Sequence, residues 1–493
     1  MLHYSVWPFV AFAAGTCLAY LVVVVVVYNL FFHPLRHFPG PWLNRVTQIP
    51  HTLLMLCGLP HKEHLELHLK YGPVVRIGPN MLSFNHPDAM KDVRGHRKAG
   101  EPEHGKDPIS VQFAGDNIVG SDRENHTRFR RALAYGFSAQ AMLEQEPTFK
   151  SYVNQLFQQL HEQSCGGKEP VDISKWYTFT TFDMIGDLAF GESFGCLDNS
   201  TYHPWVALAF ESLKSVAFLA EIGRYPSLAP LAGLMLPRGL LTKFAENKEL
   251  ASMKVRKRLD TKTDRPDFVG KITQGLKSKG TSMKFDELAS NASVLIVAGS
   301  ETTATLLSAA VYFLCADART LGLLTQEVRT TYAKAEDIDL ISTQNLRYMQ
   351  SVLDEALRMY PPVAGGGSPR TIAKGGSLVA GYYVPEDTLV ENDMWALHYD
   401  PKYFTQPHDF VPERWLGDHR FKNDRLDAVK PFSIGPRNCI GMNLAYAEMR
   451  MMLARTVWEF DLRLAEDSRN WYDESRVYLA WHKPALNVYL VPR

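Results

Sequence analysis

Residues Pro431–Glu448, which read PFSIGPRNCIGMNLAYAE, hold the most informative cysteine of this 493-residue chain. Cys439 stands between Gly435 and Gly441, directly before an apolar helical run. A cysteine in such a place can be buried filler, a nucleophile, half of a disulfide or a metal ligand. The two glycines let the backbone turn tightly and approach a flat partner closely. Free N–H groups and the dipole at the start of a helix favour a thiolate there.

A heme group accounts for all the features of this stretch. A Cys439 thiolate would ligate the iron, and backbone N–H donors aimed at the sulfur would tune its electron donation. Arg437, two residues away, supplies a cation suited to a heme propionate, Phe432 can shield the sulfur, and Gly441 allows close approach. A thiolate pushes electron density onto iron and favours cleavage of the O–O bond. The stretch therefore predicts a heme–thiolate centre with Cys439 as the metal ligand.

The pattern F-x-x-G-x-R-x-C-x-G at residues 432–441 resembles the signature of the cytochrome P450 superfamily. A chance match anywhere in the chain is on the order of 10⁻⁴, from average amino-acid usage. EALR at 355–358 and PERW at 412–415 resemble the E-x-x-R and PERF segments of the same family. Residues three apart on a helix share a face and can pair. The resemblance, which covers roughly residues 34–493, implies a network that holds the cysteine loop and consists of Glu355, Arg358 and Arg414.

The stretch AGSETT at 298–303 resembles the oxygen-binding pattern of the family. The small residues Ala298 and Gly299 would let the helix pass close over the heme and leave room for O₂. Glu301 and Thr302 would relay protons to the bound oxygen, which is general-acid chemistry. The alternative is a buried helix with incidental glycine and threonine. A glutamate in an apolar run is costly unless it is used, which favours the functional interpretation.

Two further motifs supply partners for the heme propionates. HTRFR, from His126 to Arg130, resembles the family's W/H-x-x-x-R pattern, with histidine in place of the commoner tryptophan. Arg370 follows Pro369 in the strand expected after the E-x-x-R helix. The resemblance implies that these side chains bind the propionates together with Arg437. The expected cofactor is heme b, iron protoporphyrin IX with an axial thiolate.

The distribution of helical and strand signals predicts a mainly α protein with a small β portion. Strands are expected on both sides of the turn in PVVRIGPNMLSFN, at 73–85, and a helix of about 30 residues from Asp286. The helix expected over PHKEHLELHLKY, at 60–71, carries three histidines at one-turn spacings. We interpret it as a surface helix rather than a metal site. The resemblance implies that the chain has a cytochrome P450 fold, which is preceded by one N-terminal transmembrane helix.

The N-terminus has the composition of a membrane anchor. Residues 7–32 are almost wholly apolar and uncharged, and a bilayer core needs about 20 such residues as a helix. A cleaved signal peptide, the alternative, has a shorter apolar core. Arg36 and Arg45 follow the span, which places the rest of the chain in the cytosol. We expect an anchor at 1–33, a proline-rich hinge at 34–45 and a heme–thiolate catalytic domain at 46–493, in the endoplasmic reticulum membrane with a single pass.

Composition excludes one class of partner and indicates another. Lys+Arg and Asp+Glu both number 53, so the basic excess typical of nucleic-acid binding is absent. The six cysteines are scattered, as in a reducing compartment. No dinucleotide or flavin motif is found in the chain. The resemblance therefore implies electrons from a separate NADPH–cytochrome P450 reductase, with cytochrome b5 as a further partner.

Four stretches resemble those of filamentous-fungal P450 monooxygenases of secondary metabolism, of the isotrichodermin C-15 hydroxylase type: FFHPLRHFPGPW at 31–42, YGPVVRIGPN at 71–80, TFDMIGDLAFGESF at 181–194 and FVPERWLGD at 410–418. This implies oxidation by O₂ of a small apolar substrate: a terpenoid, polyketide or alkaloid. Lys214–Pro237 resembles the membrane-dipping region over the substrate entrance. Two alternatives use the same cysteine loop: a non-oxygenase heme–thiolate isomerase or dehydratase, and a non-catalytic membrane-tethered heme binder. The Glu301–Thr302 pair favours the monooxygenase.

Overall fold

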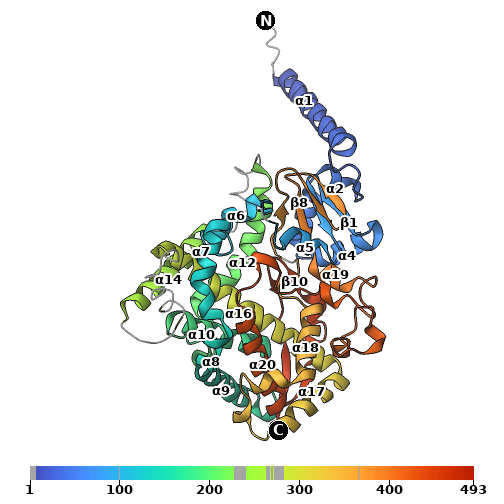
Figure 1. The fold of residues 1–493 in the computed structure, drawn as a ribbon. Helices are drawn as coiled ribbons and strands as arrows, with labels where there is room; N and C mark the ends of the chain where they lie inside the picture. Colours follow the sequence, from blue (N-terminus) through green and yellow to red (C-terminus); the bar gives the residue numbers. More distant parts are fainter. Residues whose placement is uncertain are drawn as a thin grey trace.

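The computed structural model describes residues 7–98, 100–226, 240–261, 267, 270, 283–365 and 367–493 (Figure 1). Residues 227–237 of the expected membrane-dipping region lie outside these ranges. The α-helices are α1 Trp7–Val27, α2 Trp42–Val46, α3 Ile49–Cys57, α4 Pro60–Tyr71, α5 Ala89–Arg94, α6 Pro108–Ala114, α7 Arg123–Leu133, α8 Ala139–Glu144, α9 Glu146–Gln163, α10 Ile173–Phe190, α11 Cys196–Asn199, α12 Pro204–Gly223, α14 Leu240–Asp260, α16 Phe285–Ala316, α17 Ala318–Thr331, α18 Arg347–Met359, α19 Met394–Tyr399, α20 Met442–Glu459 and α21 Trp471–Glu474.

The strands are short and form four small sheets. They are β1 Val74–Gly78, β2 Met81–Phe84, β3 Gly105–Lys106, β4 Pro170–Asp172, β5 Arg370–Thr371, β6 Ser377–Val379, β7 Tyr382–Val384, β8 Leu389–Asn392, β9 Phe460–Leu464, β10 Arg476–Val477, β11 Trp481–His482 and β12 Asn487–Pro492. The largest sheet has the order β1-β2-β8-β5-β3, and a three-stranded sheet has the order β4-β12-β9. β1 and β2 form the hairpin expected around the Gly-Pro-Asn turn. The expectation of a mainly helical chain with small sheets is confirmed.

Helix α16 runs through the middle of the helical part and organises it (Figure 1). Its first turn is held by Glu287, whose carboxylate accepts a hydrogen bond from the Lys284 backbone N–H at 2.7 Å. The helix packs along α10, α14, α18 and α20. It ends at Ala316, and Asp317 then caps α17 by accepting from the backbone N–H of Arg319 at 3.0 Å. The expected helix of about 30 residues is thus confirmed, with 32 residues.

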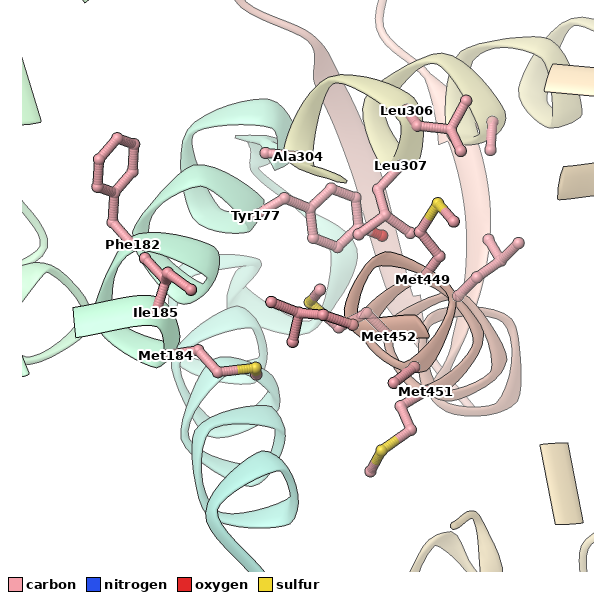
Figure 2. Packing of buried hydrophobic residues seen from close by; sticks show 14 of the residues in the cluster. Tyr177, Phe182, Met184, Ile185, Ala304, Leu306, Leu307, Met449, Met451 and Met452 are labelled. Atoms are coloured by element: carbon pink, nitrogen blue, oxygen red, sulfur yellow. The ribbon is translucent and has the colours of Figure 1, made fainter. Parts of the chain in front are cut away.

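The hydrophobic core joins three helices that fix the cysteine loop and α16 relative to each other. Figure 2 shows side chains of α10, α16 and α20 meeting. Each fully buried side chain of this size contributes about 1.5–3 kcal/mol by leaving water. Because α20 begins just after Cys439, this packing sets the distance of the cysteine loop from α16. Labelled members of the cluster are Tyr177, Phe182, Met184, Ile185, Ala304, Leu306, Leu307, Met449, Met451 and Met452.

Helix α4 has the expected bounds and an exposed face that includes Glu63 and Lys70, but its histidines are not at the surface. His61, His64 and His68 are all at most 3% exposed. His64 Nδ1 lies 3.0 Å from Asp393 Oδ2, and His68 Nε2 lies 2.8 Å from Ser83 Oγ. The histidine face is therefore buried against polar partners from elsewhere in the chain. Within the described residues, no group of three or more histidine, cysteine or acidic side chains is placed to hold a metal ion.

The N-terminal segment forms helix α1, which projects from the body and continues into a π-helical turn at Tyr28–Phe32 (Figure 1). In the described part of the chain, the apolar stretch Ala19–Phe32 is a short apolar helix. The helix there that is long and apolar enough to cross a membrane is α16, but 72% of its apolar window is buried, as in a core helix. The segment after α1 packs on the largest sheet, since Pro39 O accepts a hydrogen bond from the Arg76 backbone N–H at 2.7 Å.

Candidate active site

The cysteine loop is closed by backbone contacts. The Cys439 backbone N–H donates to Phe432 O at 2.8 Å, which joins the two ends of the motif. Gly435 has φ +77°, and a Cβ there would lie 2.1 Å from Arg94 O. Only glycine fits this position, because an L-residue would be strained and would also collide with the backbone. The loop is therefore pinned to α5 immediately before the cysteine.

The Cys439 side chain is exposed, although it lies in the interior of the fold. Burial raises the pKa of its thiol, while the Gly441 N–H and the Arg130 guanidinium act in the opposite direction. A bound cation such as iron would reverse the balance, because a coordinated thiol is deprotonated. Phe432 lies beside the loop with its ring 5.2 Å from that of Tyr446.

One face of α16 is also uncovered. Ala298 is exposed in the middle of this mostly buried helix, and Thr302, one turn on, is partly exposed. Thr302 Oγ1 donates to Ala298 O at 2.7 Å. Gly299 instead faces α10, since a Cβ there would lie 3.2 Å from Ile185 Cδ1. Ala298 and Thr302 thus lie on the open face, whereas Gly299 serves the packing of α16 against α10.

Glu301 and Thr302, which the sequence predicts to act together, have different surroundings in the structure. Glu301 is buried, and its Oε1 accepts from Lys483 Nζ at 2.5 Å and from Thr305 Oγ1 at 3.1 Å. Glu301 Oε2 has no hydrogen-bond partner among the described residues. Lys483, which follows β11, was not singled out from the sequence, because nothing local marks it as different from a surface lysine.

A pocket rich in basic side chains lies beside the cysteine loop. Its members come from α5, the segment before β3, strand β5 and the loop itself. Two are the expected Arg370 and Arg437. The one acidic member, Glu103, accepts from Arg437 Nε at 2.6 Å. The lining residues are Val93, Arg94, Gly95, Arg97, Glu103, His104, Arg370 and Arg437.

The positive charges in and beside this pocket outnumber the negative charges. Burial, together with Arg370, lowers the pKa of Arg94 to about 9. Burial, with Arg437, lowers the pKa of Arg370 to about 10 and that of Lys106 to about 7. Arg94 Nε and Arg370 Nη1 are buried without a hydrogen-bond partner among the described residues. Buried cations of this density are unfavourable without a counter-ion, and the two carboxylates of a heme fit them.

Sequence reasoning found Arg370 and Arg437 but missed the other cations. Arg94, Arg97 and His104 lie in a polar stretch, VRGHRKAGEPEHGK at 93–106, that looks like a solvated loop. The contact of this stretch with the cysteine loop is made possible by Gly435, whose added Cβ would lie 2.1 Å from Arg94 O. The pairing of this stretch with the cysteine loop depends on the path of the whole chain.

His126 and Arg130 both lie on α7, but their side chains have different partners. His126 is buried, and burial, Arg437, Lys106 and Arg130 lower its pKa to about 4. It is therefore neutral, and it lies within range of the charges of Arg437 and Lys106. Arg130 instead grips the cysteine loop, since its two terminal nitrogens donate to Asn438 O and Asn438 Oδ1, each at 2.6 Å.

The structure brings Glu355 and Arg358 of α18 together with Arg414 of the 3₁₀ turn Pro412–Leu416. Arg358 donates to both Glu355 oxygens, at 2.8 and 3.0 Å, and Arg414 Nε donates to Glu355 Oε1 at 3.0 Å. Burial alone would raise the pKa of Glu355, but the two guanidinium groups overcome it and hold the pKa below its ordinary value. All three side chains are 0% exposed. They form a structural network and do not touch the open face of α16.

The chain matches one known family and many of its members. The sequence model of the cytochrome P450 family matches residues 39–488. Trichothecene C-15 hydroxylase of Fusarium sporotrichioides is 87% identical over 493 residues, which is 100% of both chains. Cytochrome P450 monooxygenase astA of Talaromyces wortmannii is 42% identical over 474 residues, 96% of this chain and 95% of that one. Cytochrome P450 monooxygenase tpeC of Talaromyces stipitatus is 42% identical over 479 residues, 96% and 92% of the two chains.

Proposed function

Since this chain belongs to the cytochrome P450 family and is a monooxygenase of fungal secondary metabolism, we propose that it hydroxylates a trichothecene at C-15. The observation that carries the proposal is the 87% identity, over the full length of both chains, to a trichothecene C-15 hydroxylase. Such a substrate is a small terpenoid, in agreement with the apolar substrate expected from the sequence.

The side chains described above would hold heme b. Cys439 would supply the thiolate that binds the iron, with Gly441 beside the sulfur and Phe432 at the side of the loop. The propionates would take the place of the missing anions, and their proposed partners are His126, Arg130, Arg370, Arg437 and the newly found Arg94. Heme bound by a thiolate supplies the activation of O₂ and the insertion of one oxygen atom into a C–H bond.

The protein contributes binding, positioning and protons. Ala298 leaves the space over the cofactor open. Thr302 presents its hydroxyl on the open face and, by bonding to Ala298 O, loosens the helix so that water can enter. Glu301 is the proposed acid that passes protons through Thr302 to the reacting oxygen. Glu355, Arg358 and Arg414 hold the cysteine loop and do no chemistry.

The remaining partners follow from the family and from the N-terminus. Electrons come from NADPH through a separate cytochrome P450 reductase, with cytochrome b5 as a second donor. We assign α1 and the π-helical turn that follows it to the endoplasmic reticulum membrane as a single-pass anchor. The catalytic domain then faces the cytosol, because Arg36 and Arg45 follow the anchor.

The proposal is tested in membranes that contain the chain and a reductase. The dithionite-reduced, CO-bound protein should show the strongly red-shifted Soret band of a thiolate opposite CO, and Cys439→Ala should lose it. With NADPH and ¹⁸O₂, a trichothecene that lacks the C-15 hydroxyl should gain one labelled oxygen at C-15. Product that forms without NADPH would indicate an isomerase or dehydratase. Heme without turnover of any terpenoid would indicate a non-catalytic heme binder.

A further inference from the structure

The C-terminal end of the anchor helix is bound to the rest of the chain. After α1 the helix continues into the π-helical turn Tyr28–Phe32, where it meets the body of the protein (Figure 1). Asn29 is buried in this turn, and its Nδ2 donates to Val46 O, at the end of α2, at 3.0 Å. An amide side chain in an apolar stretch is costly unless it has a partner. Asn29 therefore serves the contact between the anchor and the body.

Arg76, in β1, binds the same turn from the sheet. It is 0% exposed, and its Nη1 donates to Asn29 O at 2.9 Å. Its Nε and Nη2 donate to Pro79 O at 3.1 and 2.6 Å. Within the described residues, the hydrogen bonds of this guanidinium group thus all go to backbone carbonyl oxygens. Arg45 reaches the turn as well, since its Nη2 donates to Leu30 O at 3.4 Å.

A guanidinium group suits this place for an electrostatic reason. The last carbonyl groups of a helix have no partner within the helix and carry partial negative charge. Burial and the neighbouring Arg45 lower the pKa of Arg76 to about 10, so its side chain is still charged at pH 7. Hydrogen bonds from a charged donor are stronger than those from a neutral one, and their loss is costly where water cannot replace them. The bond from Arg76 to Asn29 O therefore holds the end of the anchor firmly.

Arg76 also fixes the segment that follows the turn, through its backbone. The Arg76 N–H donates to Pro39 O at 2.7 Å, and a Cβ at Gly40 would lie 2.4 Å from Arg76 O. Between the turn and this contact, Leu35 is 0% exposed and belongs to the same hydrophobic cluster as Val74. The connection from the anchor to β1 is thus attached to Arg76 at both of its ends and is buried between them.

We propose that Arg76 makes the junction between the anchor and the catalytic domain rigid, so that the anchor sets the angle at which the domain lies on the membrane. The proposal rests on the membrane anchor of the proposed function and adds a property to it. An anchor on a loose linker only keeps the domain near the bilayer. A rigid junction also fixes the direction that the heme plane takes relative to the bilayer.

The test uses the full heme-loaded chain in lipid vesicles. After photolysis of the CO complex, the decay of the absorption anisotropy of the heme reports how the domain rotates. A domain that is rigidly joined to its anchor rotates about the membrane normal, which leaves a residual anisotropy. Arg76→Met should add a faster decay and lower that residual anisotropy. Hydrogen exchange at the backbone amides of residues 33–38 should become at least about tenfold faster in this variant.

Arg329→Met is the matched control. Arg329 also donates to carbonyl groups near the end of a helix, but these are Val457 O of α20, at 3.0 Å, and Phe460 O of β9, at 2.9 Å. The control should leave the anisotropy decay and the exchange at residues 33–38 as in the parent. If Arg76→Met does not fold, Asn29→Leu, which removes the bond to Val46 O, replaces it with the same expectations.

The outcomes separate this inference from the proposed function. Arg76→Met with the anisotropy decay and the exchange rates of the parent would overturn the inference, as would equal changes in Arg329→Met. If alkaline carbonate releases the full chain from the vesicles, the membrane anchor fails and the rigid junction fails with it. If the chain stays in the membrane but lacks the thiolate band, the proposed heme site fails, and hydrogen exchange still tests the junction. Faster exchange that is confined to Arg76→Met supports the inference.

Discussion

The buried Glu355 network gives the sharpest prediction, because exchange of one oxygen atom for an NH₂ group affects a carboxylate that accepts five hydrogen bonds. Glu355→Gln preserves the shape of the side chain and removes its charge. The carboxylate accepts two hydrogen bonds from Arg358, one from Arg414, one from Trp415 Nε1 at 2.9 Å and one from the Val411 N–H at 3.1 Å. A glutamine has a single acceptor oxygen, and its amide group would face donors.

The cost follows from burial. Glu355, Arg358 and Arg414 are all 0% exposed, so solvent cannot compensate the loss of the negative charge. Removal of one partner from a buried ion pair costs about 3–5 kcal/mol. Since about 1.4 kcal/mol is a factor of ten, the folding equilibrium should fall roughly 10²- to 4 × 10³-fold. This is a large part of the roughly 5–15 kcal/mol that keeps a domain folded.

The assay is urea unfolding followed by far-UV circular dichroism, with the reduced CO spectrum as a report on the cysteine loop. We expect the midpoint to fall by about 1 M or more, since ΔG falls by a few kcal/mol per molar urea. The thiolate band should be lost at lower urea than in the parent.

Glu413→Gln is the matched control, because it makes the same exchange at a solvent-accessible pair. Glu413 binds Arg319 at 2.5 Å, and these side chains are 18% and 55% exposed. Such pairs contribute at most about 1 kcal/mol. Equal midpoints for Glu355→Gln and Glu413→Gln would refute the argument that burial gives the network its strength.

Three further predictions concern other parts of the site. Thr302→Ala should retain heme but release peroxide, with about tenfold less product per NADPH; unchanged coupling would contradict the relay. Arg94→Met should weaken heme binding by about tenfold or more in a heme titration, while it stabilises the heme-free protein by relieving repulsion with Arg370; tighter heme binding would contradict the propionate role. Burial raises the pKa of Glu448 from 4.5 to about 8, so the folded state binds a proton that the unfolded state lacks between these values. The free energy of unfolding should therefore fall as pH rises from 5 to 8, by about 1.4 kcal/mol per unit from this group. Glu448→Gln should flatten that slope in urea unfolding at several pH values, and an unaltered slope would exclude a buried neutral acid.

Much of the fold could be predicted from local patterns. The turn between β1 and β2 has Gly-Pro-Asn, and α16 begins at acidic residues that suit a helix start, so both elements were expected close to their bounds. The helix that carries His64 was also found, but its burial was not. Histidines on a helix with several charged residues were expected in water. Burial of His64 depends on Asp393, which is its partner although it lies more than 300 residues away in the chain.

The candidate site, too, could be predicted from the sequence only in part. The resemblance named the cysteine, its glycines and the Glu355–Arg358 pair, because each lies within a short motif whose spacing has a physical reason. It did not find Arg94, whose contact with the cysteine loop joins segments more than 300 residues apart. It also did not find Lys483, whose Nζ lies 2.5 Å from Glu301 Oε1.

The sequence by itself thus predicted the ligand and determined the mainly helical fold class and the start of each motif's helix or turn, since these depend on neighbours within a few positions. The tertiary structure alone decided which charges share a buried space: Lys483 with Glu301, and Arg94 with Arg370. Such pairs depend on burial and on the packing of distant segments, and their energies arise only when water is excluded. No spacing within the chain encodes that exclusion.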